Sequence, residues 1–292
     1  RSTYVHNKIY YNPGMGYQPW VDSTGAVMTG GQNYGSAYSG TDRIPPFDTS
    51  TVNLQASVRE FFVPKNLLGD LNNQGNYWRY QIHTDGRIVR SEYLQGGTHP
   101  EGLTGRNCSS TNGGTTWRWK NCTYATPTGR TEAQERANFA TWYSYQRTRY
   151  KVAKASVGRA FAGIGGEYRV GYRNIWNNMP LSGTTGGVNW SSHPITRSKP
   201  LPVIRNKGLF DDPNGPTGTN NNKTAWYQRL YAETGSSNTP LREALYQAGR
   251  YFETDSSSTG PWGEGDGADA ADQFACRSNY MILTTDGYRN DT

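Results

Sequence analysis

The sequence predicts an α/β protein in which helices alternate with the strands of a mostly parallel sheet, joined to an irregular β-rich region that precedes them. Two observations support this. Residues 1–128 contain short strand-like segments punctuated by proline and glycine, which is typical of strands and turns. From Thr131 onward, helical patterns alternate with short apolar segments, and this alternation favours a sheet covered by helices.

The β-rich region contains four predicted strands. Residues 77–83 and 87–93 flank Thr84-Asp85-Gly86, and Asp-Gly readily adopts the positive φ angles of a tight turn. These two segments are therefore predicted to form a β-hairpin. The other two predicted strands are residues 8–11 and 57–63.

A long helix is predicted from Thr131 to about Phe161. Thr131 and Gln134 fit a capping box, in which each side chain satisfies a backbone N–H at the helix start. Alanine and aromatic residues then recur at helical spacing, which indicates a face packed in the core rather than a cofactor site. A cluster of basic residues is expected on the solvated face of this helix: Arg147, Arg149, Lys151 and Lys154.

Alternating elements are predicted after the long helix. Strands are expected at 167–172, 202–204 and 278–285, and helices at 224–233 and 240–252. The second of these helices begins with proline, which is favoured at the first helical position.

Composition favours an extracellular protein with an adhesive surface. Hydrophobic residues make up 34% of the 292 residues, whereas the chain has 21 tyrosines and 35 glycines. Tyrosine supplies contact area at a low entropy cost, so such surfaces suit binding. No apolar run in the given residues reaches the length of a membrane span, and these residues contain no signal-peptide pattern. Both ends look cut, so we expect a segment of a longer protein.

The net charge of +7 raises the question of a nucleic-acid partner. No basic run and no aromatic–basic RNA motif accompanies this charge, so nucleic acid is not expected as a partner. Attraction to anionic cell surfaces or polymers is the favoured interpretation.

Cys108 and Cys122 bracket a loop that contains Trp117 and Trp119. A disulfide across this loop would stabilise the fold by about 3 kcal/mol and would indicate an oxidising compartment. The alternative is a pair of unbonded cysteines packed as small hydrophobic residues. The two tryptophans form either an exposed binding tip or a strand that packs its rings. Cys276 has no local partner.

Enzymatic function has little support in the sequence. The histidines do not pair at metal-ligand spacing, and no nucleophile elbow, Walker loop or His-Glu-x-x-His motif occurs. A cluster of carboxylates in a glycine-rich loop has the chemistry to hold Ca²⁺, but its spacing is not that of an EF-hand, so a solvated loop is favoured. These carboxylates are Glu264, Asp266, Asp269 and Asp272.

Thr239 and Asp286 are the candidate metal ligands. Thr239 lies on a loop before a predicted helix, and Asp286 follows the apolar segment 280–283. Hydroxyl and carboxylate oxygens are the hard ligands that Mg²⁺ prefers, directly or through water. Strand ends of open α/β sheets are also where such folds bind ligands.

Several segments occur in one order over most of the chain: Tyr10-Tyr11-Asn12-Pro13, Tyr17-Gln18-Pro19-Trp20, Thr131-Glu132-Ala133-Gln134, Asn138-Phe139-Ala140-Thr141-Trp142, Val170-Gly171-Tyr172, Thr239-Pro240-Leu241-Arg242-Glu243, and Cys276-Arg277-Ser278-Asn279-Tyr280 leading into Thr285-Asp286-Gly287. This series resembles the N-terminal region of PilY-type proteins, the large tip-associated adhesins and assembly factors of bacterial type IV pili.

The resemblance implies a von Willebrand factor A-like domain that is interrupted by a variable insertion and followed by a β-propeller. It assigns residues 1–128 to the insertion, as a β-rich adhesive subdomain. It assigns 129–292 to the central part of the A-like domain, whose first strand and C-terminal part are missing. Thr239 and Asp286 then belong to its metal-ion-dependent adhesion site for Mg²⁺ or Ca²⁺.

One part of that adhesion site is missing from the sequence. The site also needs an Asp-x-Ser-x-Ser signature, and the nearest segments, Asp22-Ser23-Thr24-Gly25 and Asp48-Thr49-Ser50-Thr51, have turn-like surroundings. Mg²⁺ demands nearly ideal octahedral coordination. A divalent metal is therefore expected only where further residues complete the site.

The resemblance implies a non-enzymatic, extracellular adhesin at the pilus tip. Its expected partners are minor pilins and a host-cell or abiotic surface. The alternative is a structural subunit of an extracellular filament or surface layer, because exposed edges of tyrosine- and glycine-rich strands can pair between chains.

Overall fold

The computed structural model describes residues 3–95, 117–175, 184–185, 188–189, 209–211, 221–235, 241–253, 278 and 280–285. The chain forms two compact units. Unit 1 comprises Arg1–Trp20, Val27–Ile44 and Thr49–Ala155, and unit 2 comprises Val21–Ala26, Pro45–Asp48 and Ser156–Thr292. The boundary expected at residue 128 between an insertion and an A-like domain stays a prediction.

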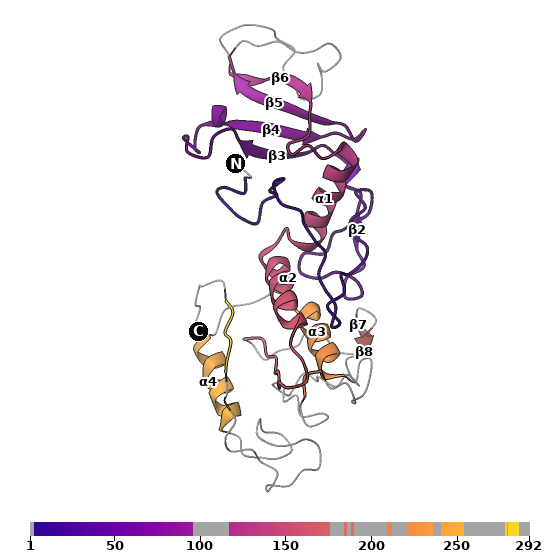
Figure 1. The fold of residues 1–292 in the computed structure, drawn as a ribbon, viewed down its shortest axis with the longest axis vertical. Coiled ribbons are helices and arrows are strands. Elements are labelled where there is room, and N and C mark those ends of the chain that lie inside the picture. Colours follow the sequence, from indigo (N-terminus) through magenta and orange to yellow (C-terminus); the bar gives the residue numbers. More distant parts are fainter. Residues whose placement is uncertain are drawn as a thin grey trace. The chain divides into compact units, whose positions relative to one another are not determined.

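Unit 1 contains a four-stranded antiparallel sheet in the order β3-β4-β5-β6 (Figure 1). The predicted strands at 57–63, 77–83 and 87–93 are confirmed. Of the two residues for which an exposed tip or a packed strand was predicted, Trp119 lies in the fourth strand and packs its ring, whereas Trp117 directly precedes that strand and is 51% exposed. The strands are β3 (Arg59–Pro64), β4 (Tyr77–Ile82), β5 (Ile88–Leu94) and β6 (Arg118–Tyr124).

The predicted hairpin joins β4 to β5. The His83 N–H donates to the Arg87 carbonyl at 2.9 Å, and Gly86 has a φ angle of 83°. Glycine suits this position because a Cβ atom is costly at positive φ. The turn sets a register in which Arg79 faces Ser91. Turn chemistry therefore decides which side chains share a face of the sheet.

The helix α1 (Glu132–Tyr145) packs Phe139 into the core of unit 1. Its start confirms the predicted capping box, because the Gln134 N–H donates to Thr131 Oγ1 at 3.2 Å and the Thr131 N–H donates to Gln134 Oε1 at 2.9 Å. The Phe139 ring meets Tyr11 edge-on, with 4.9 Å between centroids. Further core residues are Tyr34, Ala37, Leu54, Phe61, Tyr80, Ile82, Ile88 and Ala140.

Residues 8–11 lie in turns, so the strand predicted there is wrong. The Trp142 Nε1–H on α1 donates to the Ile9 carbonyl at 2.8 Å. This backbone carbonyl is therefore satisfied by a side chain and not by a neighbouring strand. The remaining short elements of unit 1 are β1 (Ala37–Tyr38), which pairs antiparallel with β2 (Thr51–Val52), and the 3₁₀ helices η1 (Leu54–Ala56) and η2 (Gln74–Asn76).

The single long helix predicted for 131–161 is wrong, because α1 is followed by a separate helix, α2 (Arg149–Ala162). The backbone leaves the helical conformation at Gln146, whose φ angle is −141°. Next to it, the Arg147 guanidinium donates to the Gly40 carbonyl at 2.8 Å. No glycine or proline marks this break, but Thr148 caps the start of α2, where its Oγ1 accepts from the Lys151 N–H at 3.2 Å.

The solvated face predicted for the basic cluster is also wrong for Lys151 and Lys154. These side chains are 0% and 3% exposed. The Lys151 Nζ donates to the Ser144 carbonyl at 2.6 Å, and the Lys154 Nζ donates to the Asp42 carbonyl at 2.7 Å. A buried ammonium group needs hydrogen-bond acceptors, so both charges serve the packing of unit 1.

Unit 2 contains α3 (Asn222–Ala232), which confirms the helix predicted at 224–233. The Trp226 ring on α3 stacks on Phe161 with 4.6 Å between centroids and meets Phe210 edge-on at 5.7 Å. α4 (Leu241–Phe252) confirms the helix predicted at 240–252, and β7 (Thr184–Thr185) pairs antiparallel with β8 (Val188–Asn189).

Two predicted strands of unit 2 are wrong over their described residues. Residues 167–172 and 280–285 form no strand, and Tyr280 and Ile282 are 86% and 76% exposed. An apolar pattern alone does not make a strand, because the backbone also needs a neighbour for its hydrogen bonds. The strand predicted at 202–204 lies outside the described residues.

The described part of the chain contains both helices and sheets, so its fold is of mixed α and β composition. Every strand pair in the described part of the chain is antiparallel, so the mostly parallel sheet expected from the sequence is not found among these strands. No helix within the described ranges is long and apolar enough to cross a bilayer.

Candidate functional site

The structure describes half of the residues that the sequence singled out for binding or cross-linking. Trp117 directly precedes β6, and Trp119 and Cys122 belong to that strand. Cys122 is completely buried. The disulfide and the metal site stay predictions, because Cys108, Thr239 and Asp286 lie outside the described residues.

Trp117 and Trp119 belong to an aromatic cluster that also contains Phe62 and Tyr93. The Tyr93 ring on β5 stacks on Trp117 with 5.6 Å between centroids and lies 5.4 Å from Trp119. The Phe62 ring on β3 lies 5.7 Å from Trp119. Side chains from β3, β5 and β6 thus build one surface, here named the aromatic cluster.

A β-bulge sets the direction of the side chains on β6. The register with β5 shifts between Arg90 and Glu92, and Asn121 has a φ angle of 51°. Asparagine tolerates this left-handed conformation better than most residues, and its Nδ2 donates to Glu92 Oε1 at 2.6 Å. The extra residue lets Trp119 face Tyr93.

Arg79 adds a fixed cation to the aromatic cluster. Its guanidinium carbon lies 4.8 Å from the centroid of the Trp119 ring, and its Nε donates to Ser91 Oγ at 3.1 Å. Burial lowers the pKa of Arg79 to about 10, and the Glu60 carboxylate opposes this shift. Arg79 is therefore still protonated at neutral pH and can strengthen the cluster by a cation–π interaction.

The two tryptophans differ in exposure. Trp117 is 51% exposed, whereas Trp119 is partly buried among its neighbours. Trp117 thus presents part of its ring to solvent, and Tyr93 joins it to the more buried Trp119. Sequence reasoning missed Phe62, Tyr93 and Arg79. The hairpin turn and the alternation of side chains along a strand could have predicted Tyr93 and Arg79. Arg79 faces Ser91 across the hairpin, and Tyr93, two residues beyond Ser91, lies on the same face of the sheet.

A second aromatic–cation contact lies near the same end of the sheet. The Trp78 ring is flanked by Lys65 Nζ at 4.4 Å and by the Arg90 guanidinium carbon at 4.3 Å from its centroid. Lys65 also forms an ion pair with Glu92 at 2.9 Å. Burial alone would raise the pKa of Glu92, but hydrogen bonds from Asn121 and Lys65 outweigh burial and hold it below its usual value.

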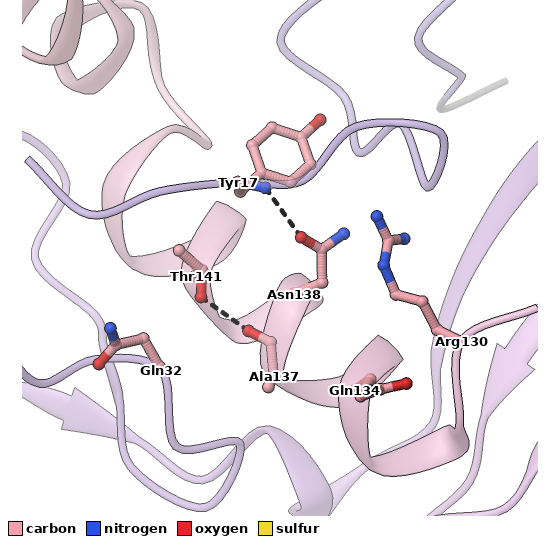
Figure 2. Close-up of a pocket in the computed structure, with 7 residues that line it drawn as sticks. All are labelled: Tyr17, Gln32, Arg130, Gln134, Ala137, Asn138 and Thr141. Carbon is pink, nitrogen blue, oxygen red and sulfur yellow. Dashed lines mark hydrogen bonds between the residues drawn. The ribbon is translucent and has the colours of Figure 1, made fainter. Parts of the chain in front are cut away.

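An open pocket of about 420 Å³ lies along α1 (Figure 2). Figure 2 shows the Asn138 amide pointing to Tyr17, whose N–H donates to Asn138 Oδ1 at 2.9 Å. The Thr141 hydroxyl donates to the Ala137 carbonyl at 2.8 Å. Both polar side chains thus bond within the protein. The lining residues are Tyr17, Gln32, Arg130, Gln134, Ala137, Asn138 and Thr141.

A buried polar network stands behind this pocket. The Glu135 carboxylate, which is completely buried, accepts hydrogen bonds from the Tyr11 hydroxyl at 2.6 Å and from Arg130 Nη1 at 3.1 Å. Asn138 Nδ2 donates to Tyr11 Oη at 2.8 Å. Burial and the charge of Glu135 raise the pKa of Tyr11. The network joins segments that carry the sequence resemblance, so these segments help to determine the fold.

Within the described part of the chain, no group of three or more His, Cys, Asp or Glu side chains is placed to hold a metal ion. The turn predicted at Asp22 is confirmed, because Asp22 Oδ1 accepts from the Thr24 N–H at 2.8 Å and from the Ala26 N–H at 3.1 Å. These hydrogen bonds stabilise a local turn.

Sequence comparison finds partial similarity to the type IV pilus biogenesis factor PilY1 of Pseudomonas aeruginosa. The protein of strain PAO1 is 29% identical over 162 residues, which are 54% of this chain and 12% of that protein. The protein of strain PAK is 28% identical over 160 residues, with the same shares, and that of strain UCBPP-PA14 is 26% identical over 156 residues, 53% of this chain and 11% of the relative.

These matches support a relationship to PilY proteins. The relationship extends over about half of this chain, and the matched region is only 12% of the length of the PAO1 protein. No family model and no solved structure matches. The type IV pilus is named in the relatives, and the similarity covers only a small part of their length.

Proposed function

We propose that this chain is an extracellular, non-enzymatic part of a type IV pilus assembly factor and tip adhesin. The observation that carries the proposal is the similarity to PilY1, a type IV pilus biogenesis factor, over 162 residues. In assembly, the chain docks on minor pilins at the pilus tip. In adhesion, it contacts a host-cell or abiotic surface.

The aromatic cluster is the proposed adhesive contact. Trp117 supplies a half-exposed flat ring that stacks on Tyr93, and Tyr93 in turn contacts Trp119. A pre-positioned aromatic side chain loses little conformational entropy on binding, and this favours a contact that must form quickly on a passing surface.

The metal site forms the second part of the proposal. Thr239 and Asp286 contribute oxygen ligands for Mg²⁺ or Ca²⁺ in a von Willebrand A-like domain, and residues outside this chain complete the coordination. Isothermal titration of the full-length protein with Mg²⁺ and with Ca²⁺ tests the assignment. Thr239→Ala and Asp286→Ala should each weaken binding of the metal, and unchanged affinity in both variants would remove these residues from the site.

Genetic complementation tests the assembly role. Deletion of the gene should reduce the number of surface pili, and the wild-type protein should restore them. Normal piliation after deletion would refute the role in assembly. A protein with Trp117→Ala should restore pili but adhere less. Tyr150→Ala is the matched control, because Tyr150 is an aromatic residue 46% exposed on α2. Equal adhesion of both variants would remove Trp117 from the contact.

A further inference from the structure

The connection between β3 and β4 exposes two adjacent leucines. Leu67 is 62% exposed and Leu68 is 97% exposed. A leucine that is almost fully exposed makes hardly any contact with its own chain, so it contributes little to folding. Isolated exposed apolar residues are common on proteins. A neighbouring pair at the tip of a turn needs a further explanation.

Hydrogen bonds hold the leucine turn in one conformation. Asn66 Oδ1 accepts from the Leu68 N–H at 2.9 Å, and the Asn66 carbonyl accepts from Asn76 Nδ2 at 2.8 Å. The Lys65 N–H donates to the Asn76 carbonyl at 2.7 Å, which closes the base of the connection. The leucines are therefore presented by an ordered turn, and their exposure is a property of the fold.

The leucine turn lies at the same end of the sheet as Trp117 (Figure 1). β3 ends at Pro64, opposite Tyr77, and the last pair between β5 and β6 is Leu94 with Arg118. The β3–β4 connection and the start of β6 thus share one end of the sheet but lie at its two opposite edges, with the end of β5 between them. This end carries two exposed leucines, a half-exposed tryptophan, the exposed Arg118 and Lys65, whose side chain is 27% exposed.

That combination has the chemistry of a membrane interface. Aliphatic side chains enter the boundary of the acyl chains, tryptophan and tyrosine prefer the headgroup level, and lysine and arginine reach lipid phosphates. We propose that this end of the sheet, here named the lipid-contact edge (Lys65, Leu67, Leu68, Trp117 and Arg118), inserts into the interfacial layer of a lipid bilayer.

The charges at the lipid-contact edge indicate which lipids it prefers. Lys65 is paired with Glu92, and the exposed Asp70 lies next to the leucine turn. Glu92 and Asp70 thus offset the charge of Lys65, and Arg118 is the other cation of this edge. Binding should depend mainly on apolar insertion, and it should occur on zwitterionic phosphatidylcholine with little dependence on salt.

This inference rests on the proposed function only in that the contacted surface is a cell membrane. Vesicle binding and piliation are measured separately. Failure of the vesicle test therefore refutes only the lipid contact, and failure of the piliation test refutes only the role in assembly. Sedimentation of the full-length protein with phosphatidylcholine vesicles at low and high NaCl is the direct test. The wild-type protein should bind to a similar extent at both salt concentrations.

The double variant Leu67→Asn, Leu68→Asn should weaken vesicle binding by about tenfold per leucine, as expected from the apolar surface that each buries. Asparagine suits a turn, so folding should be retained, and circular dichroism checks this. Leu245→Asn is the matched control, because Leu245 is 47% exposed on α4 and should leave binding unchanged.

Brominated lipids provide an independent readout. They should quench the fluorescence of the wild-type protein more than that of Trp117→Phe, because Trp117 then lies at the headgroup level. Absence of vesicle binding by the wild-type protein, equal binding by the leucine variant, or binding that high salt abolishes would each overturn the proposal. The last outcome would assign binding to the overall positive charge.

Discussion

The Tyr11 hydroxyl donates a 2.6 Å hydrogen bond to the completely buried carboxylate of Glu135, which lies 124 positions later in the sequence. The same hydroxyl accepts from Asn138 Nδ2. One phenol group thus ties the N-terminal segment of unit 1 to α1, and it satisfies a buried charge that would otherwise be costly.

Tyr11→Phe should lower the free energy of unfolding by about 1–2 kcal/mol, because it removes one hydrogen-bond donor from the buried Glu135 carboxylate and one acceptor from the Asn138 amide. Urea denaturation measures the change. Tyr10→Phe removes the same hydroxyl from the adjacent residue, which is 37% exposed, and should change stability by less than about 0.5 kcal/mol. Equal effects of the two substitutions would contradict the importance of the network.

Lys151→Met should destabilise unit 1 by about 1–3 kcal/mol, because the Ser144 carbonyl at the end of α1 loses its donor in a buried position. Arg149→Met is the control, since Arg149 is exposed two residues earlier. Thermal denaturation of both variants compares them. A Lys151 variant as stable as the wild type would show that the buried ammonium is dispensable for the break between the helices.

Glu92 should make stability depend on pH in the acidic range. Its pKa in the folded protein is held below its usual value, so its contribution is present above that value and is lost as the pH falls through the lowered pKa. Thermal denaturation from pH 7 to pH 3 should show a difference in Tm between wild type and Glu92→Gln that shrinks below about pH 4. A difference in Tm that stays constant over this pH range would show that the ionised Glu92 carboxylate does not stabilise the fold.

Substitution of Trp119 should mainly lower stability, whereas substitution of Trp117 should mainly lower surface binding. Trp119→Ala removes a ring that contacts Phe62 and Tyr93 and lies over Arg79, so it should cost about 2–4 kcal/mol of stability. Trp117→Ala removes a half-exposed ring and should cost less than about 1 kcal/mol while reducing surface binding. Chemical denaturation and an adhesion assay on both variants distinguish these roles. A larger loss of stability in Trp117→Ala than in Trp119→Ala would contradict them.

The predicted disulfide between Cys108 and Cys122 has a direct chemical test. Peptide mapping by mass spectrometry without reductant should recover the two cysteines in one linked fragment, which dithiothreitol separates. Reduction should lower stability by about 3 kcal/mol in the chain-entropy model. Cys276→Ser should leave the linked fragment unchanged, whereas its disappearance in that variant would indicate a different pairing.

Features that depend on neighbouring residues were predictable from the sequence. The capping box of Thr131 and Gln134 and the hairpin turn at Gly86 both follow from hydrogen bonds and φ preferences within a few positions. The helix predicted at 224–233 likewise depends on local pattern and is present. The aromatic cluster was only half predicted, since Trp119 meets Phe62 across the sheet.

By itself, the sequence determined the turn chemistry, the helix start and the presence of β3, β4 and β5. The tertiary structure alone decided that Lys151 is buried and that β3 and β6 flank the predicted hairpin. The physical reason is the range of the interactions. A cap or a tight turn is formed by residues a few positions apart, whereas the partners of a buried charge or a ring are chosen only when distant segments pack together.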